Sequence, residues 1–493
     1  MNKKQIVKAA AFLIVLLAVW NIATGIFIPK WTTGTSITYL TDEFYQTKKN
    51  TVEVGIIGSS QLVNGISCGR LLDEYGISAF SCATGEQPAL CGWFYLLELD
   101  RLQDIKAVIY DTSMLYEPEE EVRFRKTLDT APMSINKLRL IAERSKSQDS
   151  SSVASYLFPL MKYHTRWSQL KYEDFSYKNG NTEMFWGNVY GGKVNRNASY
   201  DKICVDNEMP DPQVKMDENE LAAFEKIVSY CEDKDIALVL VKTPKSTWER
   251  AKTDGCQELA DAYGLPYIDF NRGENLQAIG FDAGNDMWNQ DHLNVRGTDK
   301  LTDYMGAYLK EHYVLSDFRE SPDYDAGKME RFRIERSNKY LQTTIQVEEY
   351  LERLRDDRLE ILVQKSGDFS DAFSKELQEK VKALGVTVDL SQLNGQYYAA
   401  QLRNGAAVFE QIQSDPIEAD IDFADGNSGV VKSSTEDPVL MAAVGKKVPF
   451  SYHGLNILAY DKENHTVADI ATIYVNEEGT LMLDHDVQEV QEQ

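Results

Sequence analysis

The amino-acid sequence predicts an α/β protein in which a doubly wound parallel sheet follows one N-terminal transmembrane helix and precedes a smaller C-terminal α+β domain. Three observations lead to this prediction. An uncharged run from Ala9 to Ile28 matches the thickness of a bilayer core. Apolar runs then alternate with amphipathic stretches at close spacing, which is typical of a parallel sheet covered on both faces. A charged segment over 316–339 separates this region from a second one over 340–493.

The N-terminal segment over 1–31 is expected to be an uncleaved membrane anchor. Lys3, Lys4 and Lys8 precede the apolar run, so the positive-inside rule leaves the short amino end in the cytoplasm and exports the rest. A cleaved signal peptide is the alternative, but no clear small-x-small cleavage site stands before Pro29. The sequence therefore favours a single-pass cell-membrane protein whose bulk is extracytoplasmic.

Composition limits the classes of partner. The 493 residues are too many for one ordinary core, and 43% hydrophobic with 26% charged residues is ordinary for globular domains. The net charge of -25 argues against nucleic acid and suits neutral or zwitterionic glycans. Six cysteines could form disulfides outside the cell, but without a CxxC pair we expect them to be small core residues.

The predicted sheet domain covers 32–315. Its first strand, within 52–60, is an apolar run that stops at a glycine and two serines. The elements expected next are a helix at 68–76, a strand within 77–85, a helix at 89–102 and a strand within 105–115. An insert over about 117–216 interrupts the alternation, and inserts of this size usually lie over the carboxyl ends of the strands.

The alternation then resumes, and the second domain follows the linker. The remaining elements of the sheet domain are a helix at 218–235, a strand at 236–244, a helix at 248–264, a strand at 265–270, a loop at 286–297 and a helix at 298–313. In the second domain we expect helices at 343–357 and 370–385 and strands at 360–366, 396–404, 454–461 and 467–475.

Two short stretches carry the predicted chemistry. In "VEVGIIGSS", Gly58 permits a sharp turn after the first strand and Ser60 begins the next helix with an exposed hydroxyl. A serine there is often only a helix cap. A serine nucleophile also needs a base, and "NQDHLNVRG" places His292 in the loop after the last strand, which returns to the same sheet edge. We therefore expect Ser60 and His292 to be neighbours.

The stretches "GSSQ" and "DHLN" resemble those of SGNH (GDSL-type) hydrolases, in the branch similar to membrane-anchored D-alanyl transfer and envelope-polysaccharide acylation proteins. The resemblance covers about 52–313 and implies that Ser60 is the nucleophile and His292 the base. The family commonly has an aspartate three residues before the histidine, where this chain has Asn289. Asp291 is the favoured third member, with Asn289 as the alternative.

The resemblance also implies donors for the oxyanion of an acyl-transfer intermediate. Gly85 in "CATGEQ" matches the glycine of the family. In place of the asparagine the chain reads "YDTS", so Asp111, Thr112 or Ser113 must substitute, and Thr112 is our candidate.

The stretch "PLMKYHTRW" resembles an insert of related membrane-anchored members. His164, Arg166 and Trp167 could there bind a phosphate, a carboxylate or the face of a sugar, or could simply hold the insert onto the sheet.

In the second domain, the stretch over 447–473 resembles the interleukin-like EMT-inducer domain, which also occurs in a glycan-binding stem module of an animal glycosyltransferase, and the resemblance covers about 340–483. The resemblance implies glycan binding by analogy, with Tyr452 and His453 as surface candidates.

Metal and nucleotide sites are not predicted, because the chain has no HExxH, no CxxC and no lysine-containing phosphate loop. No cofactor is expected. The sequence predicts an extracytoplasmic esterase or O-acyltransferase that acts on envelope polysaccharide or a teichoic-acid-like polymer, with a membrane acyl-donor protein as a partner implied by the resemblance. The alternative is a non-catalytic glycan-binding or assembly protein with a degenerate SGNH-like domain.

Overall fold

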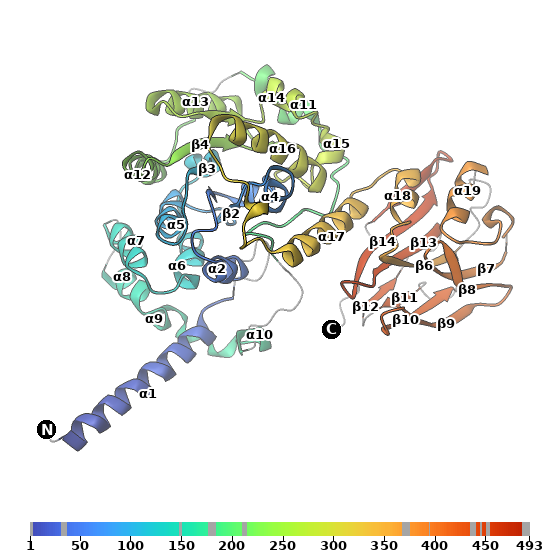
Figure 1. Ribbon diagram of the computed structural model, residues 1–493, viewed down its shortest axis with the longest axis horizontal. Coiled ribbons are helices and arrows are strands. Elements are labelled where there is room, and N and C mark those ends of the chain that lie inside the picture. Colours follow the sequence, from blue (N-terminus) through green and yellow to red (C-terminus); the bar gives the residue numbers. More distant parts are fainter. Residues whose placement is uncertain are drawn as a thin grey trace. The chain divides into compact units, whose positions relative to one another are not determined.

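A computed structural model describes residues 3–30, 37–146, 150–175, 184–209, 214–366, 375–393, 395–433, 440–443, 446–449 and 454–485 (Figure 1). The chain divides into two units, and each has its own sheets and core. Unit 1 comprises 1–190, 195–293 and 297–332, and unit 2 comprises 191–194, 294–296 and 333–493.

Five parallel strands form the centre of unit 1. They are β1 (Val54–Ile57), β2 (Ala79–Ser81), β3 (Ala107–Asp111), β4 (Ala237–Lys242) and β5 (Tyr267–Asp269). Their order is β2-β1-β3-β4-β5, so the direction of winding reverses between β1 and β3. In open α/β sheets, ligands bind outside the carboxyl ends of the strands at such a reversal.

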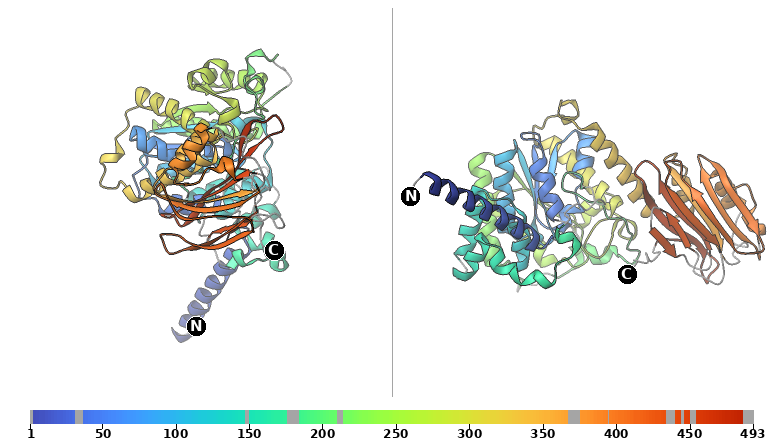
Figure 2. Two further views of the ribbon diagram at one scale, coloured as in Figure 1. Left: turned by 90° about the vertical axis from the view of Figure 1, so that its right-hand side faces the viewer. Right: turned by 90° about the horizontal axis from the view of Figure 1, so that it is seen from below.

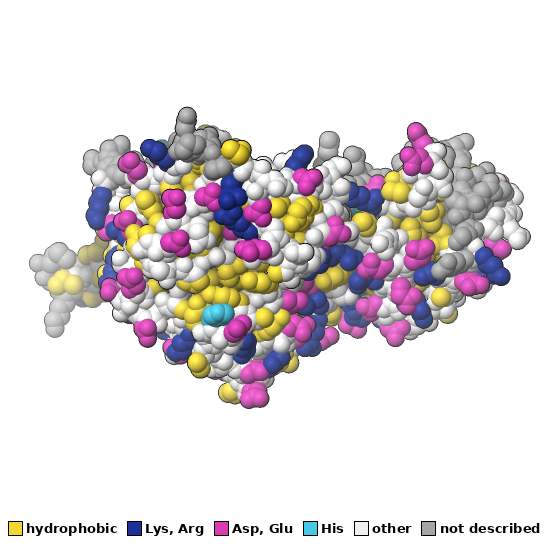
Figure 3. Space-filling view, turned by 90° about the horizontal axis from the view of Figure 1, so that it is seen from above, with side chains coloured by type: hydrophobic (Ala, Val, Ile, Leu, Met, Phe, Trp, Pro, Cys, Tyr) yellow, Lys and Arg dark blue, Asp and Glu magenta, His cyan; other side chains and the backbone are white. Residues whose placement is uncertain are grey.

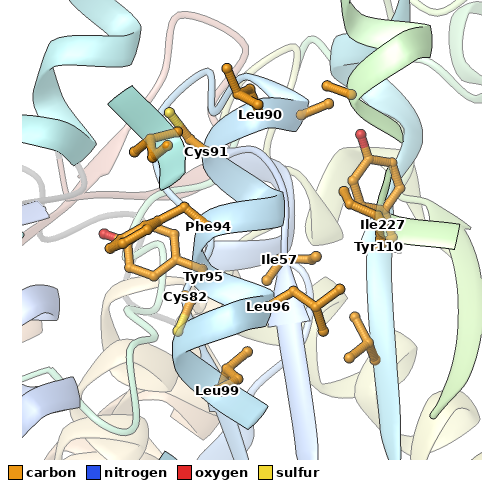
Figure 4. Close-up of a cluster of buried hydrophobic side chains, with 14 of the residues drawn as sticks. Ile57, Cys82, Leu90, Cys91, Phe94, Tyr95, Leu96, Leu99, Tyr110 and Ile227 are labelled. Atoms are coloured by element: carbon orange, nitrogen blue, oxygen red, sulfur yellow. The ribbon is translucent and has the colours of Figure 1, made fainter. Parts of the chain in front are cut away.

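Helices cover both faces of this sheet, as predicted. Helices α5 (Ala89–Leu102) and α12 (Glu218–Lys234) pack on one face, and α4 (Cys68–Tyr75) and α16 (Val295–His312) pack on the other. Side chains alternate along β3 between the two cores, and Figure 4 shows Tyr110 with Ile57 in the cluster beneath α5. Further helices are α2 (Ile37–Gln46), α3 (Ser60–Val63), α13 (Arg250–Tyr263), α14 (Gly273–Ala278) and α15 (Ala283–Asp286).

The insert after β3 is mainly helical. It contains η1 (Thr112–Tyr116), α6 (Glu121–Thr130), α7 (Ile135–Ser145), α8 (Ser150–Leu157), α9 (Leu160–Tyr163), η2 (His164–Ser168), α10 (Tyr172–Phe175), α11 (Tyr200–Ile203) and η3 (Val205–Asn207). Helices α6 and α7 pack against α5, because Phe124, Leu128 and Leu140 join the core on that side.

Helix α1 (Lys3–Phe27) extends away from the rest of unit 1 (Figures 1 and 2). Among the described residues it is the one helix that is long and apolar enough to cross a membrane, over Lys4–Phe27. None of its apolar window is buried inside the protein.

Unit 2 is an antiparallel sheet domain. One sheet has the order β15-β14-β13-β6-β7-β8 and the other β12-β11-β10-β9. The strands are β6 (Leu359–Ser366), β7 (Tyr397–Arg403), β8 (Ala406–Gln413), β9 (Ile417–Asp422), β10 (Ser428–Ser433), β11 (Leu440–Ala443), β12 (Lys446–Pro449), β13 (Gly454–Asp461), β14 (Thr466–Val475) and β15 (Leu481–Asp484). Leu362, Leu458 and Tyr460 fill one side of the larger sheet. On its other side, Ile361 and Ile457 pack with helices α18 (Val347–Arg353) and α19 (Lys375–Ala383).

The segment expected as a linker contains two helices, η4 (Phe318–Glu320) and α17 (Ala326–Gln342). Met329 and Phe332, one turn apart on α17, are buried in a small cluster with Phe185, so the charged residues lie on the remaining faces of the helix.

All six cysteines are free and buried, as expected of small core residues. Burial raises the pKa of the Cys256 and Cys231 thiols to about 12, so neither is a reactive thiolate at neutral pH.

Candidate active site

The turn after β1 requires glycine. Gly58 has φ +140, and a Cβ at this position would collide with the Cβ of Asp111 at the end of β3. Its N–H donates to Gln87 Oε1 at 2.9 Å, and its carbonyl accepts from Thr84 N at 2.9 Å. The loop after β2, which contains Gly85, is thereby held against the turn.

Asp111 fixes the two serines that follow the strand ends. Its carboxylate accepts from Ser59 N at 3.0 Å and from the Ser59 hydroxyl. It also accepts from Ser113 N at 2.9 Å and from Ser113 Oγ at 2.5 Å. The buried Ser59 side chain in turn caps α3 by accepting from Gln61 N, which places Ser60 at the first position of that helix.

Ser60 and His292 lie within hydrogen-bond distance. Ser60 Oγ is 2.8 Å from His292 Nε2, although 231 residues separate them in the chain. The serine is half-buried and follows β1, whereas the histidine lies between α15 and α16. The pair therefore sits at the carboxyl edge of the sheet, beside the reversal between β1 and β3.

Asn289 orients the imidazole. Its Oδ1 is 3.1 Å from His292 Nδ1 and accepts from the backbone N–H groups of Asp291 at 2.8 Å and His292 at 3.0 Å. Because backbone N–H groups only donate, the atom facing Nδ1 must be the amide oxygen. Nδ1 therefore carries the proton, and the lone pair of Nε2 faces the Ser60 hydroxyl.

The surroundings keep this histidine neutral. Burial is the largest cause that lowers the pKa of His292 from its ordinary 6.5; Asp291 raises it, Lys245 and Lys242 lower it, and Asp111 raises it. The net shift is downward, so at neutral pH the ring is a base ready to accept a proton.

Asp291, the favoured third member, does not contact the imidazole nitrogen in this arrangement. Its carboxylate accepts from Thr247 Oγ1 at 3.0 Å, and the neighbouring Gln290 carbonyl accepts from Ser246 N at 2.9 Å. These bonds tie the histidine loop to the loop after β4. The reason is the tight turn closed by Asn289, which directs the Asp291 side chain away from Nδ1.

Of the two predicted oxyanion donors, Gly85 lies in the loop that is bonded to the turn. Thr112 is fully buried, and its side chain lies near Cys256 and Tyr267, on α13 and β5. Thr112 begins η1, where Asp111 uses its carboxylate to hold Ser59 and Ser113, so the threonine turns into the core. The Thr112 hydroxyl therefore does not face the Ser60 site, and the prediction that it donates to the oxyanion is not supported.

The structure places His164, Arg166 and Trp167 on η2, beside the carboxyl end of α1. Arg166 donates to the Phe27 carbonyl and, at 3.0 Å, to Asp174 Oδ1. His164 Nδ1 is 3.1 Å from the carbonyls of Leu160 and Met161. These three side chains therefore lie beside the carboxyl end of α1 and not at the Ser60 site. Tyr452 and His453, the candidates in unit 2, lie outside the described residues.

Three further side chains near the site were not anticipated. Gln61 Oε1 accepts from Thr243 Oγ1 at 3.1 Å and from the Lys242 ammonium, and it lies 2.9 Å from Ser113 Oγ, whose single proton goes to Asp111. Burial lowers the pKa of Lys242 to about 8, and its ammonium lies over the Trp248 ring. Trp288, part-exposed, has its ring 6.0 Å from that of His292. Of these three, only Lys242 had a signal in the sequence, since a lysine ends the apolar run "LVLVK".

Within the described residues, no group of three His, Cys, Asp or Glu side chains is placed to hold a metal ion. Compared with models of known protein families and with curated proteins, the chain matches none.

Proposed function

We propose that this chain is a membrane-anchored serine esterase or O-acyltransferase of the SGNH type that acts outside the cytoplasm on envelope polysaccharide or a teichoic-acid-like polymer. One observation carries the proposal: the Ser60 hydroxyl faces a neutral His292 whose tautomer is held by Asn289. A nucleophile, a base and a group that orients the base are the parts that acyl transfer through serine requires.

The reaction follows from this geometry. His292 Nε2 takes the proton of Ser60 while Oγ attacks the carbonyl carbon of an ester. Two backbone N–H groups donate hydrogen bonds to the oxyanion, that of Ser60 and that of Gly85. The N–H of Ser60 is free for this because it has no acceptor within its own helix. His292 then gives its proton to the departing alkoxide and leaves an acyl-enzyme. A water molecule or a sugar hydroxyl, deprotonated by His292, then attacks the acyl carbon; the bond to Ser60 Oγ breaks, and His292 returns its proton to that oxygen.

The polymer class is inferred from the surroundings of the site and from the N-terminal helix. Trp288 offers a part-exposed ring beside His292, and an aromatic face of this kind suits the apolar face of a sugar. An enzyme tethered by α1 meets polymer near the membrane at high effective concentration. By analogy, unit 2 would bind glycan and a membrane protein would supply the acyl group.

Substitution of the nucleophile tests the proposal. We expect Ser60→Ala and His292→Ala in the full chain to abolish labelling by a fluorophosphonate probe and to slow hydrolysis of a small acetyl ester by about 10³-fold or more. Ser199→Ala is the matched control, because the Ser199 side chain makes no capping bond. Turnover by Ser60→Ala at the wild-type rate would falsify the role of Ser60.

One observation favours the non-catalytic alternative, namely that an amide stands where serine hydrolases place a carboxylate. An amide oxygen orients the imidazole but stabilises the imidazolium less than a carboxylate does. Under that alternative the folded wild-type protein takes up no fluorophosphonate, while it still binds envelope glycan.

A further inference from the structure

Large apolar side chains are exposed on one segment of the insert in unit 1. Trp167 is 73% exposed, Tyr172 79% and Phe175 63%, and Phe158 and Met161 are about half exposed. Soluble proteins seldom present so many aromatic rings to water within one short segment. We call residues 157–175 the platform.

The platform contacts the apolar helix. The rings of Phe158 and Trp20 meet edge to face with centroids 6.1 Å apart. Trp20 stands seven residues before the end of α1 at Phe27, which is about 10 Å along a helix axis. Phe158 therefore reaches the side of α1 well inside its apolar span.

Two polar contacts hold the platform at this position. Arg166 donates to the carbonyl of Phe27, the last residue of α1, and also to Asp174. Asp174 accepts from Lys171 N at 2.9 Å, which closes the loop between η2 and α10. The exposed rings are thus fixed beside the end of α1 rather than carried on a free loop.

The charge of the platform differs from that of the chain. Residues 157–175 contain Lys162, Arg166 and Lys171 against Glu173 and Asp174, which leaves a net charge of +1, whereas the whole chain has a net charge of -25. On the face that Figure 3 shows, acidic and basic side chains are interspersed. Basic residues next to exposed aromatic rings suit the boundary between lipid phosphates and acyl chains.

We infer that the platform lies in the interfacial layer of the membrane that α1 crosses, and so gives unit 1 a second membrane contact. This inference rests on the proposed membrane anchor. The occupant of the exposed surface is lipid, because the surface is continuous with the apolar side of α1 and carries charge opposite to that of phosphate headgroups. A helix and a lateral platform together restrict the tilt of unit 1 and hold the Ser60 site at a fixed height above the bilayer.

Depth-dependent quenching tests the inference on the full chain in lipid vesicles. A bimane label is attached to Met161→Cys or Trp167→Cys, since the six native thiols are buried. Leu16→Cys on α1 is the control within the bilayer, and Met209→Cys, at an 89% exposed position of unit 1, is the control in water. We expect brominated acyl chains to remove about half or more of the fluorescence at 161 and 167, as at 16, and little at 209.

The outcomes separate the hypotheses. If the labels at 161 and 167 resist quenching as the label at 209 does, while the label at 16 is quenched, the platform inference is wrong and the anchor stands. Resistance at 16 as well would overturn both. Neither measurement uses turnover, so failure here leaves the role of Ser60 untouched.

Charge reversal supplies a second measurement. In vesicles with anionic lipid, Lys162→Glu with Lys171→Glu should reduce the quenching at 161, because two contacts with phosphate are replaced by repulsion. Lys202→Glu with Lys215→Glu makes the same change in charge on exposed positions outside the platform and should leave the quenching unchanged. Equal quenching in both double variants would show that the charge of the platform contributes nothing.

Discussion

At the scale of single residues, the tautomer of His292 depends on which atom of the Asn289 side-chain amide faces it. An asparagine in place of a catalytic aspartate ordinarily risks presenting its NH₂ group to the histidine, which selects the wrong tautomer. Here the backbone N–H groups of Asp291 and His292 both point at Asn289 Oδ1, so the amide cannot reverse without losing two hydrogen bonds. The geometry that a serine–histidine dyad requires is present, and the negative charge of a carboxylate beside the imidazole is missing.

Restoring that charge gives a prediction. Asn289→Asp should raise kcat/KM for a small ester at neutral pH by about tenfold or more, because a carboxylate stabilises the imidazolium that forms in the transition state. The pKa of His292, lowered by burial, places the acid limb of the wild-type pH profile below 6.5. The added carboxylate favours the protonated ring, so the acid limb should move to higher pH.

A pH–rate series on the full chain checks this prediction. Asn50→Asp is the matched control, because it adds the same charge at an exposed position before β1, at the opposite edge of the sheet. An acid limb that stays in place in Asn289→Asp would mean that His292 is not the titrating base.

The sequence predicted that Ser60 and His292 are neighbours, but not which residues hold them in place. Ser60 and His292 were predictable because strand ends and the loop after the last strand meet at one sheet edge, and their proximity is confirmed. The roles of Asn289 and Asp291 were not predictable, since a turn of four residues decides which side chain faces Nδ1. Thr112 was misplaced for a similar reason, because a carboxylate one residue earlier turned it into the core. The chemistry of all these residues stays a prediction.

At the scale of elements, the turn from β1 to α3 decides whether the site forms. Two features require glycine at position 58. Its φ is positive, and β3 lies so close that a Cβ would collide with Asp111. Gly58→Ala should therefore cost about 2–4 kcal/mol of stability and displace Ser60 from His292. Calorimetry should show a lowered transition for unit 1, and fluorophosphonate labelling should fall with it.

Gly284→Ala is the control for that change. Gly284 lies in α15 with an ordinary φ, and an added Cβ would meet only Asp282 Oδ1, at 3.6 Å. The free energy of unfolding of the Gly284→Ala variant should stay within about 1 kcal/mol of the wild type. A Gly58→Ala protein as stable as this control would show that the turn accepts a side chain.

The elements that could be predicted from the sequence are those with a clear hydrophobic pattern. All five strands of the parallel sheet were expected, because parallel strands buried on both faces read as continuous apolar runs. The strands β8, β9, β10, β11, β12 and β15 of unit 2 were missed. In β9 and β10 buried positions alternate with half-buried or exposed ones, and β8 is half-buried or exposed throughout, so none of these three strands reads as a strand buried on both faces. Helix α17 was taken for a linker because only one narrow side of it is apolar.

At the scale of the whole molecule, the two units have separate hydrophobic cores. Unit 1 has one cluster on each face of its parallel sheet. Unit 2 has one cluster on each side of its six-stranded sheet. Since each core closes within its own unit, each unit is expected to unfold cooperatively by itself.

Two truncations of buried side chains test this independence. Leu458→Ala in unit 2 and Phe94→Ala in unit 1 each remove a fully buried side chain, which costs about 2–5 kcal/mol. We expect two calorimetric transitions in the full chain, of which each variant lowers a different one. Fluorophosphonate labelling should survive Leu458→Ala and should be lost on heating at the unit 1 transition. A single transition lowered equally by both variants would contradict two independent cores, because it would require the sheets of the two units to unfold as one.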